Sequence, residues 1–488
     1  MRDPVTLPLW LAAALAALAA VAVLDRLLFP GLRWFLRRRV QGVIDRINSR
    51  LRLRIHPFKL TRRAVLVDRL RYDPRVLEAV EAHMRETGEP REVVSRRVLR
   101  YAREIVPSFN AYAYFRLGYW VARGAARALY RVRVGYADDA GLSRVEPGAS
   151  VVFVMNHRSN MDYVLVSYLA AERTALSYAV GEWARTWPLQ TLIRAMGAYF
   201  IRRDSRDPIY RRVLERYVQI ATESGIVQAV FPEGGLTRDG ALRPPRLGLL
   251  EYMLRAFDPR GGRDLVFVPV GINYDRVLED RALLAEGGGE RSGAVSKSAA
   301  AARFALRQAA LWVLGRWHRF GYACVNFGSP LSMREWLSAR GVDLRALPRE
   351  ERMAVVQSFA GGLMAEVGRV VPVLPVSLVA TVLLQADGRP LGELELHART
   401  QALRRRLEGS GAHVYVPRTD EEYATAVGLR MLTLRRIVEA RGGAIAPVPA
   451  ELPLLRYYAA AIRHLLPEAA APEGSGPAGA GGTTAPAA

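Results

Sequence analysis

The sequence predicts an α/β protein: a mixed sheet flanked by helices over residues 132–330, helical regions on both sides, and an N-terminal membrane anchor. Three observations predict this organisation. Short β-rich runs alternate with helical segments between residues 132 and 330, as in parallel or mixed α/β sheets. Apolar residues recur at helical spacing before and after that region. An uncharged apolar run of 20 residues lies near the N-terminus.

The apolar run from Val5 to Leu24 is long enough to cross a hydrocarbon core as a helix. Five arginines between Arg26 and Arg39 follow it, and Arg2 alone precedes it. By the positive-inside rule, residues 1–30 are expected to anchor the chain in the cell membrane, with the remainder on the cytoplasmic side. A cleaved signal peptide is the alternative, and the basic cluster after the run disfavours it.

Helices are expected on both sides of the central region. Residues 31–131 carry stripes of apolar side chains at helical spacing, among them Val76, Val80, Val94 and Val98. Residues 331–466 are also expected to be helical, with Ser332 as the N-cap of the first helix. The apolar stretch at 370–384 holds two prolines and is short for a membrane span, so it is expected to be buried. Residues 467–488 lack aromatic residues and are expected to be disordered.

The central region is predicted to form strands and helices in alternation. The strands are expected at Val151–Val154, Ser177–Val180, Tyr199–Ile201, Ile226–Phe231, Leu265–Val270 and Tyr322–Phe327. The helices are expected at Trp187–Met196, Ile209–Glu223, Leu247–Ala256 and Ala299–Gly315. In open sheets of this kind, ligands collect at the carboxyl ends of the strands, and four polar motifs are expected at such ends.

The composition excludes several kinds of site. A formal charge of +23 and a pI near 10.7 indicate a partner that carries phosphate: nucleic acid, anionic lipid, a coenzyme or a small substrate. Cys324 is the single cysteine, which excludes an intramolecular disulfide and multi-cysteine metal sites. The seven histidines are scattered, so no metal site is expected. The common nucleotide-binding and serine-hydrolase motifs are missing from the sequence.

The first motif, M-N-H-R-S-N-M-D, places His157 five positions before Asp162, directly after a predicted buried strand. An imidazole is the side chain best suited to accept a proton near neutral pH, and a carboxylate can hold one of its ring nitrogens. This pair is suited to activating a substrate hydroxyl without a protein nucleophile. We interpret His157 as a general base and Asp162 as the residue that orients it.

The second motif, G-A-Y-F-I-R-R at residues 197–203, places Arg202 and Arg203 after another predicted strand. Guanidinium groups offer forked donors to a phosphate. The fourth motif, V-P-V-G-I-N-Y-D at residues 268–275, is interpreted as a buried strand that shapes the pocket wall.

The third motif, F-P-E-G-G-L-T-R at residues 231–238, follows a buried strand with an acid and two glycines. Glu233 is a candidate acceptor of a hydrogen bond from a substrate hydroxyl. Gly234 lacks a side chain and lets a ligand approach the backbone. Arg238 and Arg246 supply positive charge nearby.

Taken in order, the four motifs resemble the four blocks of the glycerolipid acyltransferases, specifically the glycerol-3-phosphate and dihydroxyacetone-phosphate branch. The similarity extends from about Tyr101 to Leu466, roughly three quarters of the chain. It implies transfer of a fatty acyl group from a thioester, on coenzyme A or acyl carrier protein, to the 1-hydroxyl of glycerol 3-phosphate, which gives lysophosphatidate. Neither a covalent acyl-enzyme, nor a metal, nor another cofactor is implied.

The resemblance also implies roles for individual residues. His157 would deprotonate the hydroxyl and Asp162 would orient the imidazole. Arg202, Arg203 and Arg238 would bind the acceptor phosphate, and Glu233 and Gly234 would position the glycerol. Arg158, Ser159 and Arg246 complete the set of expected substrate-binding residues. The expected partners are glycerol 3-phosphate, the acyl donor and membrane phospholipids, and no nucleic acid.

Two departures from the family pattern leave the acceptor open. Leu236 stands where this branch usually has an arginine, and Met155 and Asn156 replace the usual residues before the histidine. The same chemistry on dihydroxyacetone phosphate or a lysophospholipid is therefore an alternative. A more distant one is a basic membrane-attached protein that binds nucleic acid or anionic lipid without catalysis.

Overall fold

The computed structural model describes residues 63–108, 118–170, 176–180, 194, 197–202, 205–255, 257–287, 319–417 and 420–466. The expected anchor at residues 1–30, the tail at 467–488 and Arg203 lie outside the described residues. The helices expected at 187–196 and 299–315 also lie outside them, apart from Arg194. Within the described ranges, no helix is both long enough and apolar enough to cross a membrane.

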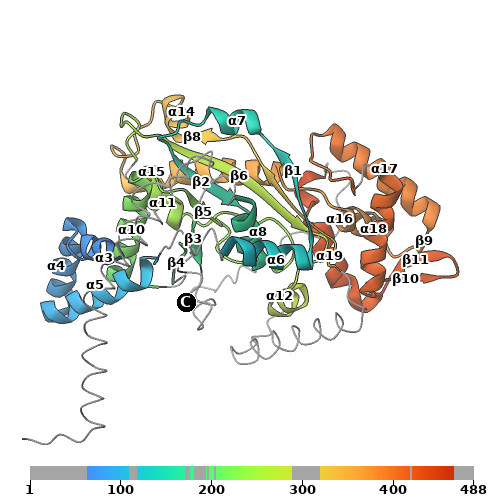
Figure 1. The fold of residues 1–488 in the computed structure, drawn as a ribbon, viewed down its shortest axis with the longest axis horizontal. Helices are drawn as coiled ribbons and strands as arrows, with labels where there is room; N and C mark the ends of the chain where they lie inside the picture. The colour runs from blue at the N-terminus through green and yellow to red at the C-terminus, as the bar shows by residue number, and fades with distance from the viewer. Residues whose placement is uncertain are drawn as a thin grey trace, which may run out of the picture. The chain divides into compact units, whose positions relative to one another are not determined.

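The described residues include an eight-stranded mixed sheet in the order β1-β7-β6-β2-β5-β3-β4, with β8 paired to β6 (Figure 1). Neighbouring strands are parallel except that β7 and β8 run antiparallel to β6. The strands are β1 Arg131–Ala137, β2 Ser150–Met155, β3 Ser177–Val180, β4 Tyr199–Phe200, β5 Gln228–Val230, β6 Leu265–Tyr274, β7 Tyr322–Phe327 and β8 Leu331–Ser332. The predicted mixed α/β fold is confirmed.

The six strands expected from the sequence are all present, with ends that differ by a few residues. β1 was not expected, and its side chains explain why. It is an edge strand paired with β7 alone, and most of its residues are partly or fully exposed. Its alternation of arginine and valine therefore lacks the apolar signal of a buried strand.

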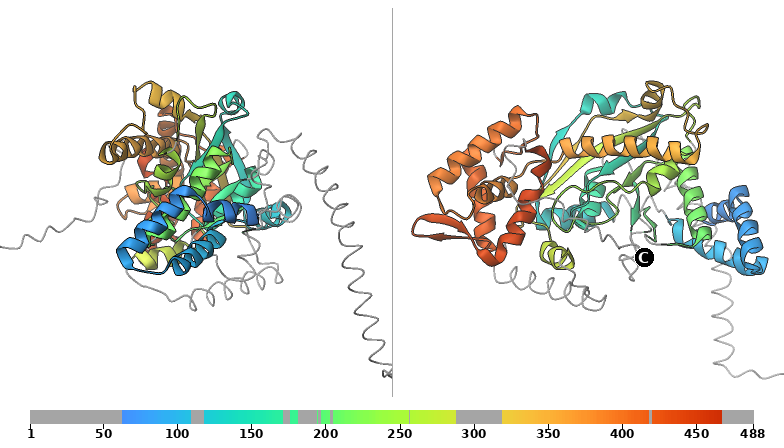
Figure 2. Two further views of the ribbon diagram at one scale, coloured as in Figure 1. Left: turned by 90° about the vertical axis from the view of Figure 1, so that its left-hand side faces the viewer. Right: turned by 180° about the vertical axis from the view of Figure 1, so that it is seen from behind.

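β2 is the strand that positions the first motif. All six of its residues are buried, because it lies between β5 and β6 and is covered on both faces. Helix α15 (Arg349–Arg369) packs against β2 and β6 on one face (Figure 2). Helices α6 (Tyr119–Leu129) and α8 (Met161–Ala170) pack together on the other (Figure 1). The described residues of this region also include the helices α7 (Asp139–Arg144), α11 (Gly248–Leu254) and α12 (Asp280–Gly287).

The helices before the sheet bury the predicted apolar stripes. Helices α3 (Arg63–Arg71), α4 (Pro74–Thr87) and α5 (Arg91–Ile105) pack against α10 (Pro208–Glu223). Val76, Val80, Val94 and Val98 are all buried there, which confirms the expected pattern. Asp207 begins α10, because its side chain accepts hydrogen bonds from the first backbone N–H groups of the helix.

The region after the sheet is only partly helical, which corrects the expectation for residues 331–466. It contains α14 (Met333–Ser338), α15, α16 (Pro375–Gln385), α17 (Glu393–Gly409), α18 (Glu421–Leu434), α19 (Leu452–Ala460) and the 3₁₀ turns η6 (Pro449–Glu451) and η7 (Arg463–Leu465). It also contains a three-stranded antiparallel sheet of β9 (Leu391–Gly392), β10 (Val438–Arg441) and β11 (Ala444–Pro447). Gly442 and Gly443 link β10 to β11, and both have positive φ, as a two-residue hairpin turn requires.

Two finer expectations for this region are confirmed. Ser332 caps α14, since its hydroxyl accepts a 3.1 Å hydrogen bond from the N–H of Glu335. The apolar stretch at 370–384 is buried, and most of it forms α16, which packs against α17, α18 and α19.

Candidate active site

The carboxyl ends of β2, β5 and β6 bring three motifs together. β2 is the parallel neighbour of both β5 and β6, so the residues that follow these strands meet at one edge of the sheet. His157 follows β2, Glu233 follows β5, and Tyr274 is the last residue of β6. All three side chains are buried.

His157 and Asp162 form the predicted pair. Nδ1 of His157 lies 2.9 Å from Oδ2 of Asp162, and the two side chains are 1% and 0% exposed. Oδ2 also accepts hydrogen bonds from two backbone N–H groups, of Arg158 at 2.7 Å and Ser159 at 3.0 Å. It therefore acts as an acceptor, and the proton of the imidazole is on Nδ1.

The other ring nitrogen of His157, Nε2, is buried and has no hydrogen-bond partner among the described residues. A buried polar atom without a partner costs free energy unless another molecule supplies one. The ring is held from two sides: it stacks on Phe231 at 4.1 Å between centroids and meets the edge of Tyr163 at 5.3 Å. Its orientation is thus fixed, and Nε2 is left as an acceptor that no described residue uses.

Tyr274 holds the second oxygen of Asp162. Its hydroxyl donates a 2.6 Å hydrogen bond to Oδ1, and burial raises the pKa of this tyrosine well above its ordinary value. The hydroxyl therefore remains protonated and remains a donor. The sequence interpretation had assigned this strand only to the pocket wall, although Tyr274 lies within the fourth motif.

The carboxylate of Glu233 binds two backbone N–H groups rather than facing an open space. Oε1 accepts the N–H of His157 at 2.8 Å, and Oε2 accepts the N–H of Arg243 at 3.2 Å. Burial raises the pKa of this carboxyl to about 7. The hydrogen bond from a substrate hydroxyl to Glu233 stays a prediction, while the observed partners give the residue a positioning role.

Gly234 lies where a side chain would not fit. Its φ is +70°, and a Cβ atom there would lie 2.5 Å from Cδ of Arg246. The group that approaches this glycine is thus the side chain of Arg246, an exposed residue. Arg238 is also exposed.

Arg202 has a protein partner. Its Nε and Nη2 donate hydrogen bonds of 2.8 and 2.7 Å to the two carboxylate oxygens of Glu104, and its guanidinium lies over the rings of Tyr101 and Tyr210. The donors expected to bind phosphate are therefore engaged by α5.

Arg158 and Ser159 are buried and bonded within the protein. Nη1 of Arg158 donates to the carbonyl oxygen of Gly240 at 2.7 Å, whereas its Nε and Nη2 have no hydrogen-bond partner among the described residues. The Ser159 hydroxyl donates to Oε2 of Glu279 at 2.7 Å. Glu279 lies outside the four motifs, so no sequence signal indicated this contact.

No group of three or more His, Cys, Asp or Glu side chains within the described residues is placed to hold a metal ion. The lone Cys324 is buried, and burial raises the pKa of its thiol to about 12.

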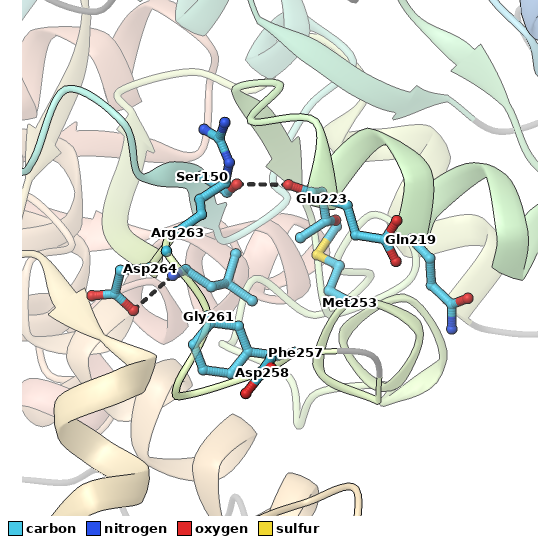
Figure 3. A pocket seen from close by; sticks show the side chains of 12 residues that line it. Ser150, Gln219, Glu223, Met253, Phe257, Asp258, Gly261, Arg263 and Asp264 are labelled. Atoms are coloured by element: carbon cyan, nitrogen blue, oxygen red, sulfur yellow. Dashed lines mark hydrogen bonds between the residues drawn. The ribbon is translucent and has the colours of Figure 1, made fainter.

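A cavity of about 190 Å³ lies elsewhere, at the amino ends of β2 and β6 (Figure 3). Ser150 and Leu265, the first residues of these strands, line it together with Thr222 and Met253. His157 lies beyond the opposite ends of the same strands. This cavity is therefore separate from the candidate active site.

An α/β sheet with a buried His-Asp pair beyond its carboxyl edge defines a class of enzyme that can activate a hydroxyl group. The comparisons agree: the Acyltransferase family model matches residues 138–273, so the chain contains an acyltransferase domain. The model of the glycerol-3-phosphate acyltransferase C-terminal region matches residues 310–472. The resemblance to the glycerol-3-phosphate acyltransferase family is confirmed.

Curated relatives of this chain are named glycerol-3-phosphate acyltransferase. The glycerol-3-phosphate acyltransferase of Xanthomonas campestris pv. campestris is 28% identical over 381 residues, which cover 76% of this chain and 42% of that protein. That of Pseudomonas fluorescens is 31% identical over 364 residues, 72% of this chain and 40% of that protein. The glycerol-3-phosphate acyltransferase of Xylella fastidiosa strain M12 is 26% identical over 448 residues, which cover 88% of this chain and 50% of that protein. The chain thus spans about half the length, or less, of these curated relatives.

Among solved structures, a 1-acyl-sn-glycerophosphate acyltransferase from Thermotoga maritima matches with a TM-score of 0.29 and 17% identity. The match covers 51% of this chain and 80% of that one, and the score is too low to establish a shared fold.

Proposed function

We propose that this chain transfers a fatty acyl group from the thioester of coenzyme A or acyl carrier protein to the 1-hydroxyl of glycerol 3-phosphate. The observation that carries the proposal is the His157–Asp162 pair, with Nδ1 held at 2.9 Å and Nε2 buried without a partner in the described part of the chain. The family matches and the names of the relatives support the choice of acceptor.

The reaction needs one base and no protein nucleophile. Nε2 of His157 removes the proton of the 1-hydroxyl, and the oxygen attacks the carbonyl carbon of the thioester. The tetrahedral intermediate expels the thiolate, which takes the proton back from Nε2. Asp162 keeps the proton of the neutral imidazole on Nδ1 and stabilises the imidazolium that forms in between.

The acceptor phosphate is bound in this proposal by Arg238 and Arg246, the exposed arginines that follow Glu233. Arg203 keeps its predicted phosphate role. Arg202 would join them only if its pair with Glu104 opened.

The test is an assay of the full-length protein with labelled palmitoyl-coenzyme A or palmitoyl-acyl carrier protein and a panel of acceptors. Labelled lysophosphatidate from glycerol 3-phosphate, lost in His157→Ala, is the expected result. Faster turnover of dihydroxyacetone phosphate or a lysophospholipid would reassign the acceptor. Binding to anionic vesicles without turnover of any acceptor, unchanged in His157→Ala, would overturn the enzymatic proposal.

We also propose that residues 5–24 hold the protein in the cell membrane, in contact with phospholipids, with the catalytic part on the cytoplasmic side. The support is the uncharged run and the five arginines after it. The protein should stay in the membrane pellet after alkaline carbonate extraction, and deletion of residues 1–30 should release it. Recovery of the full-length chain in the soluble fraction would contradict the anchor.

A further inference from the structure

The connection from β6 to α12, Tyr274 to Asp280, lies between the catalytic pair and helix α19 of the C-terminal region. On the catalytic side, the Tyr274 hydroxyl donates to Oδ1 of Asp162 at 2.6 Å. Glu279 then accepts the Ser159 hydroxyl at 2.7 Å and the N–H of Asn160 at 3.2 Å. Both ends of the connection therefore contact the turn between His157 and Asp162.

Helix α19 holds the same connection from the other side, and it packs beside α12 (Figure 1). The Tyr458 hydroxyl accepts the N–H of Val277 at 3.1 Å and Nη1 of Arg435 at 2.6 Å, and it donates to Oδ2 of Asp280. Arg435 also lies 2.7 Å from Oδ2 of Asp280, and the two side chains are 9% and 4% exposed. This network lies in low-dielectric surroundings, where an unmet hydrogen bond is costly.

The preceding residue of α19, Tyr457, contacts the first motif through its ring and the turn just after the third motif through its backbone. The Arg158 guanidinium lies over the Tyr457 ring at 5.3 Å. A Cβ atom on Gly240 would lie 1.9 Å from the Tyr457 carbonyl oxygen, so the turn at Gly240 packs directly on the α19 backbone. The Tyr457 hydroxyl, in contrast to that of Tyr458, is buried without a hydrogen-bond partner among the described residues.

We propose that Tyr458 is a positioning residue of the acyl-transfer site: by holding Val277 and Asp280, it keeps Tyr274 and Glu279 in contact with the turn that carries His157 and Asp162. The C-terminal region is then a working part of the active site rather than an appended domain. The kinetic test of this inference rests on the proposed function. Its spectroscopic test rests only on the geometry of His157 and Asp162.

Two adjacent substitutions make the same chemical change with different consequences. Tyr458→Phe removes a hydroxyl that has three partners, and Tyr457→Phe removes one that has none in the described residues. In Tyr458→Phe we expect kcat to fall by about tenfold to 10²-fold, the scale of a small misplacement of catalytic groups. The KM values for both substrates should stay within about twofold, because no substrate contact is lost. Tyr457→Phe should behave as wild type.

A spectroscopic measurement separates this inference from the proposed function. The ¹H resonance of the His157 Nδ1 proton reports its hydrogen bond to Asp162 and is assigned by its loss in His157→Gln. The chemical shift of this resonance should change in Tyr458→Phe and should be the same as in wild type in Tyr457→Phe. If wild type acylates none of the acceptors tested, the functional proposal fails, while the resonance still tests the positioning role.

Three outcomes would overturn the positioning role. In the first, Tyr458→Phe folds and keeps both kcat and the resonance of wild type. In the second, it loses thermal stability alone, which is a purely structural effect. In the third, the two Phe variants change kcat equally. If Tyr458→Phe does not fold, Asp280→Asn takes its place: a lower kcat with a shifted resonance supports the inference, and wild-type values for both reject it.

Discussion

The carboxylate of Glu233 accepts a 2.8 Å hydrogen bond from the backbone N–H of His157, so the third motif fixes the loop that carries the first. Its other oxygen accepts the N–H of Arg243. Glu233 is 3% exposed, and water cannot easily replace these bonds. The glutamate thus sets the position of the general base through the main chain.

The pH dependence of stability should reveal this buried carboxyl. Burial raises the pKa of Glu233 from 4.5 to about 7, so the folded state holds the proton more tightly than the unfolded chain. Its contribution to stability is fully present below pH 4.5 and is lost as the pH rises through about 7. We expect the free energy of unfolding, measured with urea, to fall less between these pH values in Glu233→Gln than in wild type.

Asp275 is a second buried carboxyl group that contributes to the pH dependence of stability. Burial raises its pKa to about 7 as well, so part of the pH dependence should persist in Glu233→Gln. Glu146→Gln, at an exposed glutamate, is the matched control for loss of a carboxylate. Identical slopes in wild type and Glu233→Gln would contradict the assignment to Glu233.

The catalytic pair should show the largest kinetic effects. His157→Gln removes the base, and loss of general-base catalysis typically lowers kcat by ~10²–10⁴-fold. Asp162→Asn replaces an acceptor oxygen with an amide, which favours the wrong tautomer of the imidazole, and should lower kcat strongly as well. Steady-state kinetics of the two single variants and the double variant provide the test. Because the residues act as a unit, the double variant should be hardly worse than His157→Gln, and a multiplicative loss would contradict the pairing.

Much of this site could be predicted from the sequence, and the reason is local. His157 and Asp162 are five positions apart, so a strand end followed by a helix brings them together whatever surrounds them. Gly234 and Glu233 follow a strand in the same way. The expected position of the motifs at the carboxyl ends of strands is confirmed for the first and third motifs, which follow the neighbouring strands β2 and β5.

The remaining features depend on contacts between distant segments. Glu233 binds a residue 76 positions away, and the Tyr458 hydroxyl reaches Asp280 across 178 positions. The pairing of Arg202 with Glu104 spans 98 positions. No periodicity or spacing encodes such partners. The hairpin of β10 and β11 is different, because its Gly-Gly turn is a local signal that the sequence interpretation missed.

Gly234→Ala should damage the site through Arg246. A non-glycine residue at positive φ costs about 1–2 kcal/mol, and the new methyl group must also displace the Arg246 side chain from 2.5 Å. We expect lower stability together with a higher KM for glycerol 3-phosphate. Gly388 has a φ of +78°, and a Cβ atom there would meet nothing within 4 Å. Gly388→Ala should therefore lower stability only through the unfavourable backbone conformation.

The comparison of these two glycines isolates the Arg246 contact. Urea unfolding should show a loss of stability in both variants, at least as large in Gly234→Ala, whereas only Gly234→Ala should change the acceptor KM. An unchanged KM in Gly234→Ala would show that the position of Arg246 does not matter for acceptor binding.

Tyr274→Phe should lower kcat and stability together, since it removes a hydrogen bond to a buried carboxylate without changing the ring. Such bonds contribute about 1.5–3 kcal/mol. Initial rates at saturating substrate and urea unfolding measure the two effects. Tyr199→Phe is the control, because the hydroxyl of this buried tyrosine has no hydrogen-bond partner among the described residues. Equal effects of the two substitutions would count against a specific role for the contact with Asp162.

Arg202 offers the clearest test of a phosphate role against a structural one. Its guanidinium binds both oxygens of Glu104, and the two side chains are 33% and 13% exposed. If that pair persists during turnover, Arg202→Ala should lower stability by at least the ~0.2–1 kcal/mol that exposed pairs contribute, because this pair is half-buried. It should leave the acceptor KM unchanged.

A double-mutant cycle with Glu104→Gln gives the decisive measurement. A structural pair predicts that the stability losses of the two single variants do not add, because each removes the same interaction. Arg246→Ala, measured in parallel, should raise the acceptor KM, since it removes an exposed positive charge beside Gly234. A KM that rises in Arg202→Ala and falls in Glu104→Gln would instead mean that the glutamate competes with the substrate phosphate for Arg202.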